Sequence, residues 1–221
     1  MLPIVKICGL TTEETLDAAI HAGADMVGFV FFQRSPRFIE VEIARGLAAR
    51  VGGETEVVAL TVDMDDAGLD EIVTATDPDW LQLHGRETPE RVVAVRKRFG
   101  RPVMKAVAIG GATDLAAAQA FVEVADRLLL DAKPPPGADR PGGHGRTFDW
   151  SALAGFDPAI PWMLSGGLTP GNVAAALAIS GATGVDVSSG VEIAPGVKDA
   201  ALIRAFVMAA RHLPVTVAVT E

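Results

Sequence analysis

The chain has 221 residues, of which 49% are hydrophobic, so it can bury one substantial core but is short for two domains. Its 28 Asp and Glu residues outnumber its 19 Lys and Arg residues, and the net charge is −9. This balance argues against a broad surface for nucleic acid or anionic membranes, so an anionic ligand would need a local positive site.

We expect a soluble cytoplasmic protein. The first six residues do not form a basic leader before an apolar stretch, and no window approaches the ~18 uncharged apolar residues of a membrane span. Cys8 is the single cysteine, which excludes an internal disulfide and a multi-cysteine metal site. The usual motifs of zinc hydrolases, P-loop proteins and dinucleotide-binding proteins do not occur.

Short apolar runs recur along the chain and alternate with alanine-rich segments that carry helix signals. Thr12 and Thr88-Pro89 are typical helix starts, and Gly23 and Gly181 are typical of helix ends. The near-continuous apolar character of the runs suits parallel strands that are covered by helices. The predicted strands, in chain order, are residues 4–7, 26–31, 57–62, 80–83, 102–107, 127–130, 161–164 and 184–187.

Eight such βα units of about 27 residues each are close to the minimum for a right-handed crossover that carries its own helix. We therefore predict an α/β fold, a single-domain (β/α)8 TIM barrel over residues 1–213, with a C-terminal tail at 214–221. A doubly wound open sheet is the competing architecture, because alternation alone does not reveal closure. The barrel would carry its chemistry at the carboxyl ends of the strands, where the Pro- and Gly-rich residues 133–146 are expected to form a mobile loop.

Two polar side chains end apolar strands at this rim. Cys8 follows the first strand and shares a strand face with Lys6, whose charge would lower the thiol pKa if the two lie close together. Asp131 follows the sixth strand, where a charge is unfavourable unless it has a partner or a function. The plain alternative for Cys8 is a small buried apolar residue.

The last two strands end in glycine and serine. Gly166 and Gly167 follow the seventh strand, and Ser189 and Gly190 follow the eighth. Such residues let a ligand approach backbone N–H groups, and the loops after these two strands are the usual phosphate site of the fold. A tight turn without a ligand is the alternative for Gly166 and Gly167.

Two other strand ends carry side chains of types that can bind ligands. Arg34 and Arg37 flank a proline-fixed turn after the second strand, and a guanidinium can bind a carboxylate through two hydrogen bonds. Two solvated loop arginines would give the same composition. His84 ends the fourth strand and either contacts a ligand or is a structural imidazole, of which we favour the second.

The chain contains, in order, the motifs Lys6-Ile7-Cys8-Gly9, Arg34-Ser35-Pro36-Arg37, Leu81-Gln82-Leu83-His84-Gly85, Leu130-Asp131, Phe148-Asp149-Trp150, Leu164-Ser165-Gly166-Gly167-Leu168, Asp186-Val187-Ser188-Ser189-Gly190-Val191-Glu192 and Pro195-Gly196-Val197-Lys198-Asp199. Any one of them is weak, but in this order they resemble the phosphoribosylanthranilate isomerase family of tryptophan biosynthesis over essentially the whole chain. That family converts N-(5-phospho-β-D-ribosyl)anthranilate to 1-(2-carboxyphenylamino)-1-deoxy-D-ribulose 5-phosphate by an Amadori rearrangement, without a cofactor.

The resemblance implies roles for the candidate residues. Cys8 matches the family's general base, and Asp131 matches its general acid. Arg37 matches the residue that binds the anthranilate carboxylate. Asp186 matches a residue that contacts the ribose hydroxyls or belongs to the catalytic network. The expected substrate-binding residues are Arg37, Gln82, His84 and Asp186, and the expected phosphate-binding residues are Gly143, Gly145, Gly166, Gly167, Ser189 and Gly190.

The sequence also leaves alternatives. Where the family commonly reads Gly-Gly-Thr-Gly, this chain has Gly142-Gly143-His144-Gly145, which puts a threonine contact in doubt. The rival functions are the histidine-pathway aminoaldose isomerase, whose family carries an aspartate where Cys8 stands, and a non-catalytic barrel that binds a phosphorylated metabolite. The expected partner is a small phosphorylated substrate, not nucleic acid or a membrane, and the expected assembly is a monomer or a homodimer.

Overall fold

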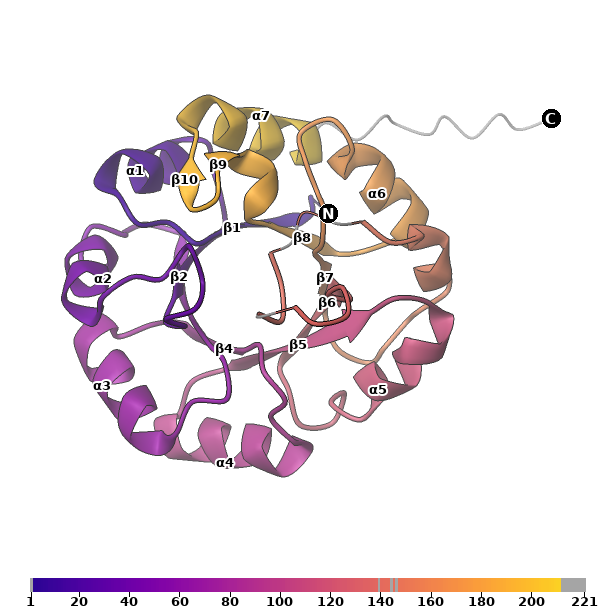
Figure 1. Ribbon diagram of the computed structural model, residues 1–221, viewed down its shortest axis with the longest axis horizontal. Coiled ribbons are helices and arrows are strands. Elements are labelled where there is room, and N and C mark those ends of the chain that lie inside the picture. Colours follow the sequence, from indigo (N-terminus) through magenta and orange to yellow (C-terminus); the bar gives the residue numbers. More distant parts are fainter. Residues whose placement is uncertain (1, 139, 144, 146, 212–221) are drawn as a thin grey trace.

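The protein is a closed ring of eight parallel strands surrounded by helices (Figure 1). This computed structural model describes residues 2–138, 140–143, 145 and 147–211. The strands pair in chain order from β1 to β8, and β8 pairs with β1 to close the ring. The predicted (β/α)8 barrel is thereby confirmed, and the open sheet is excluded. Residues 214–221, expected as a tail, and His144 lie outside the described residues.

The barrel strands are β1 (Ile4–Cys8), β2 (Met26–Val30), β3 (Glu56–Thr61), β4 (Trp80–Leu83), β5 (Val103–Ile109), β6 (Arg127–Ala132), β7 (Trp162–Leu164) and β8 (Gly184–Val187). The outer helices are α1 (Glu13–His21), α2 (Val41–Ala48), α3 (Asp66–Thr76), α4 (Pro89–Phe99), α5 (Leu115–Gln119), α6 (Val173–Ser180) and α7 (Ala200–Arg211). Short 3-10 helices are η1 (Ala112–Asp114), η2 (Trp150–Leu153) and η3 (Ser189–Val191), and β9 (Glu192–Ala194) pairs with β10 (Val197–Lys198) in an antiparallel hairpin. No helix in the described part of the chain combines the length and the hydropathy needed to cross a bilayer.

The predicted helix signals act as expected. The Thr12 side chain caps α1, and the Thr88 side chain caps α4, whose first turn contains Pro89. Gly181 ends α6 in the left-handed conformation. These short-range contacts set where each helix leaves and rejoins the ring.

The alternation of strand and helix is incomplete in the sixth unit, where the sequence predicts another full βα crossover. Between β6 and β7 the described residues form only the 3-10 helix η2. Three consecutive prolines, Pro134 to Pro136, directly follow β6 and lack the backbone N–H groups that a helix interior needs, so this part of the segment is a loop. The segment instead passes over the mouth of the ring (Figure 1). The strand β6 also runs to Ala132, so Asp131 lies within it, and the hairpin β9–β10 is an element that the sequence does not indicate.

The interior of the ring changes from apolar to polar along the strands. Two positions beyond Leu129 and Met163, on the same strand faces, lie Asp131 and Ser165. Below these polar groups the ring is filled, so a cavity can open only at the carboxyl ends of the strands. The buried apolar layer consists of Met26, Val58, Met104, Ala106, Leu129 and Met163.

Three aspartates clamp neighbouring strands together at the opposite, amino-terminal end. Asp25, Asp79 and Asp126 each directly precede a strand, and each holds both backbone groups of one residue in the strand before it. The Val57 N–H donates to Asp79 Oδ2 at 2.7 Å, and the Asp79 N–H donates to the Val57 carbonyl at 2.9 Å. Asp25 and Asp126 make the same pair of contacts with Val5 and Val103. The clamps thus join β1 to β2, β3 to β4 and β5 to β6.

We predict that Asp79→Ala lowers the free energy of unfolding by about 1–3 kcal/mol, because a backbone N–H loses its charged acceptor. Urea unfolding followed by circular dichroism measures this loss. Asp157→Ala, which removes an exposed aspartate in the loop before β7, is the control and should change stability by less than about 0.5 kcal/mol. Equal stabilities for the two variants would contradict the clamp.

Candidate active site

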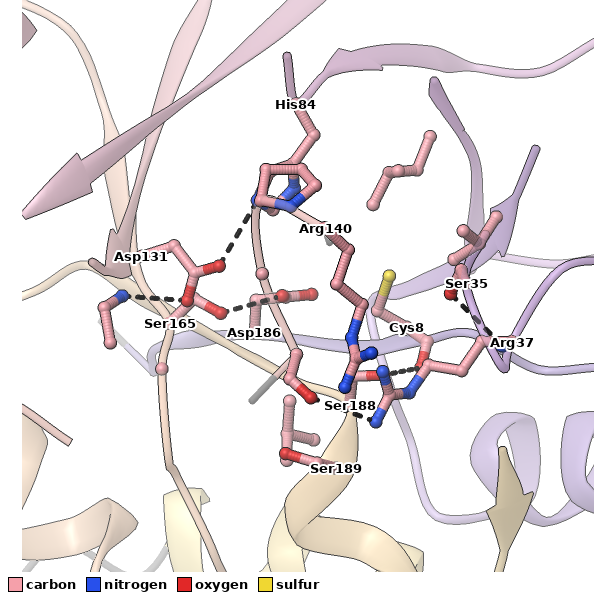
Figure 2. A pocket seen from close by; sticks show the side chains of 18 of the residues that line it. Cys8, Ser35, Arg37, His84, Asp131, Arg140, Ser165, Asp186, Ser188 and Ser189 are labelled. Carbon is pink, nitrogen blue, oxygen red and sulfur yellow. Dashed lines mark hydrogen bonds and ion pairs between the residues drawn. The ribbon is translucent and has the colours of Figure 1, made fainter. Parts of the chain in front are cut away.

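A pocket of about 790 Å³, including the space at its open mouth, lies at the carboxyl ends of the barrel strands. Its size is in the range of small-molecule sites. Apolar side chains of β2 and β3 form one wall, and polar groups of β1, β6, β7 and β8 face them. Figure 2 shows Cys8 and Asp131 among the labelled side chains around this cavity. Of the predicted site residues, the pocket is lined by Cys8, Arg37, His84, Asp131, Gly143, Gly145, Gly166, Gly167, Asp186 and Ser189.

Cys8 ends β1 and is only 3% exposed. Burial raises the pKa of its thiol above the ordinary value, and the charge of Lys6 offsets only part of this effect. Lys6 thus lowers this pKa as expected, but burial is the larger effect and the net shift is upward. The charge of Asp186, whose Oδ1 lies 2.6 Å from the Lys6 ammonium, adds to the rise.

Lys6 is a fully buried cation at the centre of the ring. Burial by itself would lower its pKa, but Asp186 and Cys8 reverse this effect, so the Lys6 pKa is raised and the ammonium keeps its proton. Asp186 Oδ2 accepts a second hydrogen bond, from Ser165 Oγ at 3.1 Å. Both Asp186 oxygens are thus bound to protein groups, and Asp186 orients Lys6 towards the thiol.

Gly28 makes room for this arrangement. A side-chain carbon at position 28 would lie 3.0 Å from Cys8 Sγ and 3.3 Å from Lys6 Cε. Both distances are tighter than ordinary van der Waals contacts, so a residue larger than glycine would displace the thiol or the lysine. Sequence reasoning missed Gly28, although a glycine inside a buried strand is a known sign of close approach.

Asp131 lies inside β6 and faces the pocket beside His84. Its Oδ1 accepts from the Ala132 N–H at 2.9 Å, and its Oδ2 lies 3.2 Å from His84 Nε2. The Gln82 amide nitrogen donates to His84 Nδ1 at 3.0 Å, which leaves the ring proton on Nε2, facing Asp131. Gln82 is fully buried and is not among the residues that line the pocket, and its contact with the site runs through His84.

The predicted phosphate-binding glycines have different structural roles. Gly166 and Gly190 are required by packing: a side-chain carbon would lie 2.4 Å from Ala132 Cβ at position 166 and 1.7 Å from the Leu168 carbonyl oxygen at position 190. Gly190 does not line the pocket, whereas Gly167 and Ser189 do. Substitution of Gly166 or Gly190 would therefore disturb the fold and could not report a ligand contact.

The backbone near these residues offers N–H groups to an anion. Ser189 begins the 3-10 helix η3, and the first N–H groups of a helix have no partner within it. The β7–α6 loop is held in shape by Asn172, which accepts from the Thr169 N–H at 2.7 Å and donates to the Gly167 carbonyl at 3.0 Å. The loop after β7 and the start of η3 thus lie together at one edge of the pocket.

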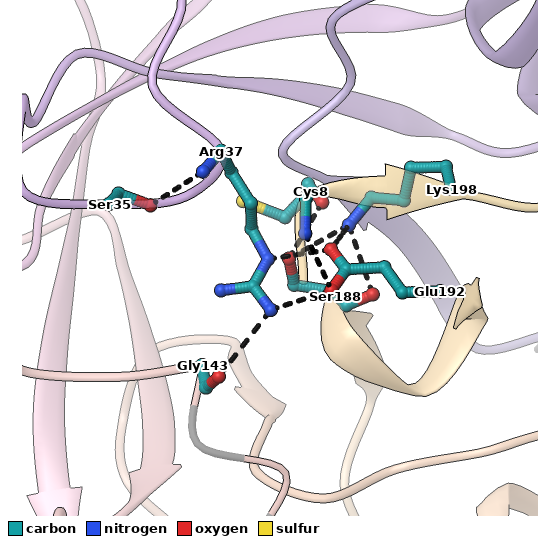
Figure 3. Close-up of polar contacts among 8 residues, drawn as sticks. Cys8, Ser35, Arg37, Gly143, Ser188, Glu192 and Lys198 are labelled. Atoms are coloured by element: carbon teal, nitrogen blue, oxygen red, sulfur yellow. Dashed lines mark hydrogen bonds and ion pairs between the residues drawn. The ribbon is translucent and has the colours of Figure 1, made fainter. Parts of the chain in front are cut away.

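Arg37 lines the pocket and forms a fork with a buried carboxylate, Glu192 (Figure 3). Arg37 Nε and Nη2 donate to Glu192 Oε1 and Oε2 at 2.7 and 2.8 Å. Lys198 Nζ donates to Glu192 Oε1 at 2.6 Å and to the Ser188 carbonyl at 3.0 Å. Although Glu192 and Lys198 occur in the motifs quoted above, the sequence assigns neither a role, because the contact that joins Glu192 to Arg37 spans 155 residues.

The geometry brings a buried thiol, two carboxyl groups and three cationic side chains around one cavity. A protonated carboxyl can give a proton to a ligand, and a thiolate can take one, so the site suits acid–base chemistry on an anionic molecule. Within the described residues, no group of three or more His, Cys, Asp and Glu side chains is arranged to hold a metal ion. Arg140, Lys133 and Ser188 also line the pocket, and sequence reasoning missed all three.

This chain is similar to known proteins over almost its whole length. The family model for N-(5'-phosphoribosyl)anthranilate isomerase matches residues 5–209. The N-(5'-phosphoribosyl)anthranilate isomerase of Rhodopseudomonas palustris (strain BisB5) is 59% identical over 211 residues, covering 96% of this chain and 97% of the relative.

Two solved structures of this enzyme have similar folds. A phosphoribosyl anthranilate isomerase in complex with reduced 1-(o-carboxyphenylamino)-1-deoxyribulose 5-phosphate has a TM-score of 0.83 at 33% identity, covering 95% of this chain and 98% of the other. A structure of generated monomers of the dimeric enzyme from Thermotoga maritima has a TM-score of 0.82 at 34% identity, with the same coverage. By sequence and by structure, this chain belongs to the N-(5'-phosphoribosyl)anthranilate isomerase family.

Proposed function

We propose that this chain converts N-(5-phospho-β-D-ribosyl)anthranilate to the corresponding 1-deoxyribulose 5-phosphate, with Cys8 as general base and Asp131 as general acid. The observation that carries the proposal is that both side chains line one pocket, although they come from β1 and β6. We further propose that the enzyme is cytoplasmic, that its single domain covers residues 1–213, and that it acts as a monomer or a homodimer.

The pocket has a group for each charged part of this substrate. The phosphate would bind at the ends of β7 and β8, where Gly167, Ser189 and the start of η3 present backbone N–H groups. The anthranilate carboxylate would bind to the guanidinium of Arg37. These local cationic and N–H groups let a chain of net charge −9 bind an anion.

Asp131 supports the first step, the opening of the furanose ring. Its carboxyl proton passes to the ring oxygen as the C1′–O bond breaks, and a Schiff-base cation forms at C1′. The Asp131 carboxylate that results accepts hydrogen bonds from His84 Nε2 and the Ala132 N–H. These donors stabilise the charge that the proton transfer creates.

Cys8 supports the second step. The cation at C1′ makes the C2′ proton acidic, the Cys8 thiolate removes it, and an enolamine forms. This enolamine becomes the ketone as C1′ gains a proton and the C2′ hydroxyl loses one, so the reaction is a net isomerisation. Lys6 stabilises the thiolate that this step requires, because its charge acts on Cys8 in a buried site.

Turnover decides between this function and its rivals. We expect conversion of phosphoribosylanthranilate in an assay of the purified chain, run beside the aminoaldose substrate of histidine biosynthesis. Preference for the histidine-pathway substrate would favour the related isomerase instead. Binding of phosphorylated sugars without turnover of either compound would indicate a non-catalytic barrel and would overturn the proposal.

We predict that Cys8→Ala and Asp131→Asn each lower kcat by at least about 100-fold, as expected for loss of a general base or a general acid. Steady-state kinetics on phosphoribosylanthranilate measures the loss, and circular dichroism checks that each variant is folded. Glu71→Gln, an exposed side chain on α3, serves as the control and should keep wild-type kinetics. Wild-type turnover in either site variant would remove that residue from the mechanism.

We also predict a high titration midpoint for the Cys8 thiol, because burial raises its pKa. The rate of iodoacetamide alkylation follows the thiolate fraction, and Cys8 is the only cysteine, so the label reports this thiol alone. The rate should rise with pH to a midpoint above that of the same chain unfolded in urea. A midpoint below the unfolded value would show that Lys6 outweighs burial.

A further inference from the structure

The mechanism above leaves one buried acidic group of the site without a function. Glu192 begins the hairpin strand β9, and its side chain is 4% exposed. Burial would raise its pKa, but the hydrogen bond from Arg37 and the charge of Lys198 hold that pKa below its ordinary value. Glu192 is thus a buried carboxylate anion beside the pocket, and burying such a charge is unfavourable unless it is paired or has a function.

Four donors occupy the two oxygens of Glu192. Oε1 accepts from Arg37 Nε and from Lys198 Nζ, and Oε2 accepts from Arg37 Nη2 and from the Gly196 N–H at 3.2 Å. A carboxylate offers about four acceptor sites, so Glu192 has no further capacity. It can therefore neither accept a hydrogen bond from a ligand nor act as a base. What it can do is hold the groups that donate to it.

The group it holds most tightly is the guanidinium of Arg37. Glu192 takes the edge formed by Nε and Nη2, and Nη2 also approaches the Gly143 carbonyl at 3.4 Å. Among the described residues, no hydrogen bond involves Nη1, the third nitrogen of the Arg37 guanidinium. Because a guanidinium is planar and rigid, fixing one edge also fixes the direction of the other donors.

The hairpin that carries Glu192 is itself packed against the turn before Arg37. Gly196, at the tip of the hairpin, has a φ of +82°, and a side-chain carbon there would lie 2.2 Å from the Pro36 carbonyl oxygen. The Ser35 hydroxyl accepts the Arg37 N–H at 3.1 Å and fixes the same turn from the other side. Both the backbone and the side chain of Arg37 are therefore held (Figure 3).

The charges of this cluster also suit an anionic ligand. Arg37 and Lys198 contribute two positive charges and Glu192 one negative charge, and all three side chains are at most 5% exposed. The cluster thus keeps a net positive charge that solvent screens weakly. A ligand carboxylate at the open side of Arg37 would complete the pairing.

We propose that Glu192 is a positioning residue for substrate specificity: it holds Arg37, through the hairpin β9–β10, in the orientation that selects substrates with an aromatic carboxylate. This inference rests on the proposed function. In it Lys198 and Gly196 complete the hydrogen bonding of Glu192, and the hairpin is the part of the fold that links carboxylate recognition to η3 at the phosphate end of the pocket.

The test compares two substrates on each variant: phosphoribosylanthranilate, and its analogue without the ring carboxylate, phosphoribosylaniline. Glu192→Gln keeps the size of the side chain but replaces one acceptor oxygen by a donor, so it cannot accept both N–H groups of Arg37. We expect the ratio of the two kcat/KM values to fall by about 10-fold or more, the effect of losing a charge-assisted alignment. The loss should come mainly from a higher KM for phosphoribosylanthranilate, with kcat little changed.

The ratio is robust to poor folding, because both substrates are measured on the same sample and the fraction of active enzyme cancels. Glu42→Gln, in the exposed ion pair with Arg45, is the matched control and should leave the ratio unchanged. In the Arg37→Ala background, Glu192→Gln should lower the ratio no further, since the two residues act as one unit.

Three results would overturn the inference. An equal loss of kcat/KM for both substrates would show a merely structural Glu192, and an unchanged ratio would show that Arg37 needs no such support. A further fall of the ratio in the Arg37→Ala background would show that Glu192 acts independently of Arg37. If the wild-type chain turns over neither substrate, the proposed function fails first, and this inference fails with it.

Discussion

The site depends on the seam where the first strand of the barrel meets the last. Lys6 and Asp186 are direct register partners across this seam, and their buried ion pair joins residues 180 apart in sequence. The same seam carries the hydrogen bond from Ser188 Oγ to the Cys8 carbonyl. A buried ion pair adds little net stability, but the loss of one partner strongly destabilises the protein because the other charge stays buried and unpaired. Its value here is placement: closure of the ring brings Asp186 to Lys6, and this pairing holds the lysine ammonium beside the thiol of the same strand.

The architecture could be predicted from the sequence because the strands are short, apolar and regularly spaced, and because Thr12, Thr88 and Gly181 mark helix ends through local contacts. The sixth unit differs because its described residues between β6 and β7 form only the short 3-10 helix η2, and the alternating pattern of the sequence does not show how short a connecting helix is. Asp131 was recognised as a charge that ends an apolar strand, and Cys8 as the only thiol. Both were found because each is unusual for its local surroundings.

The parts that could not be predicted are those that depend on distant contacts. The net pKa shift of Cys8 is a balance between burial and the charge of Lys6, and only the structure shows that Asp186 shares that charge. Gln82 was expected to meet the substrate, yet it lies behind His84, because strand alternation gives the face of a residue but not its depth. The contact of Arg37 with Glu192 joins two loops that no local pattern connects.

The aspartate clamps at the amino-terminal end have a consequence for how the chain reaches this closed state. They join strands in consecutive pairs across separations of 20, 22 and 23 residues, and Thr183 joins β7 to β8 by donating to the Trp162 carbonyl across 21 residues. The entropy lost on closing a loop grows with its length, so these pairings are the least unfavourable long-range contacts to form. By the same reasoning, the seam between β8 and β1, whose partners Lys6 and Asp186 lie 180 residues apart, is the join with the largest entropic barrier.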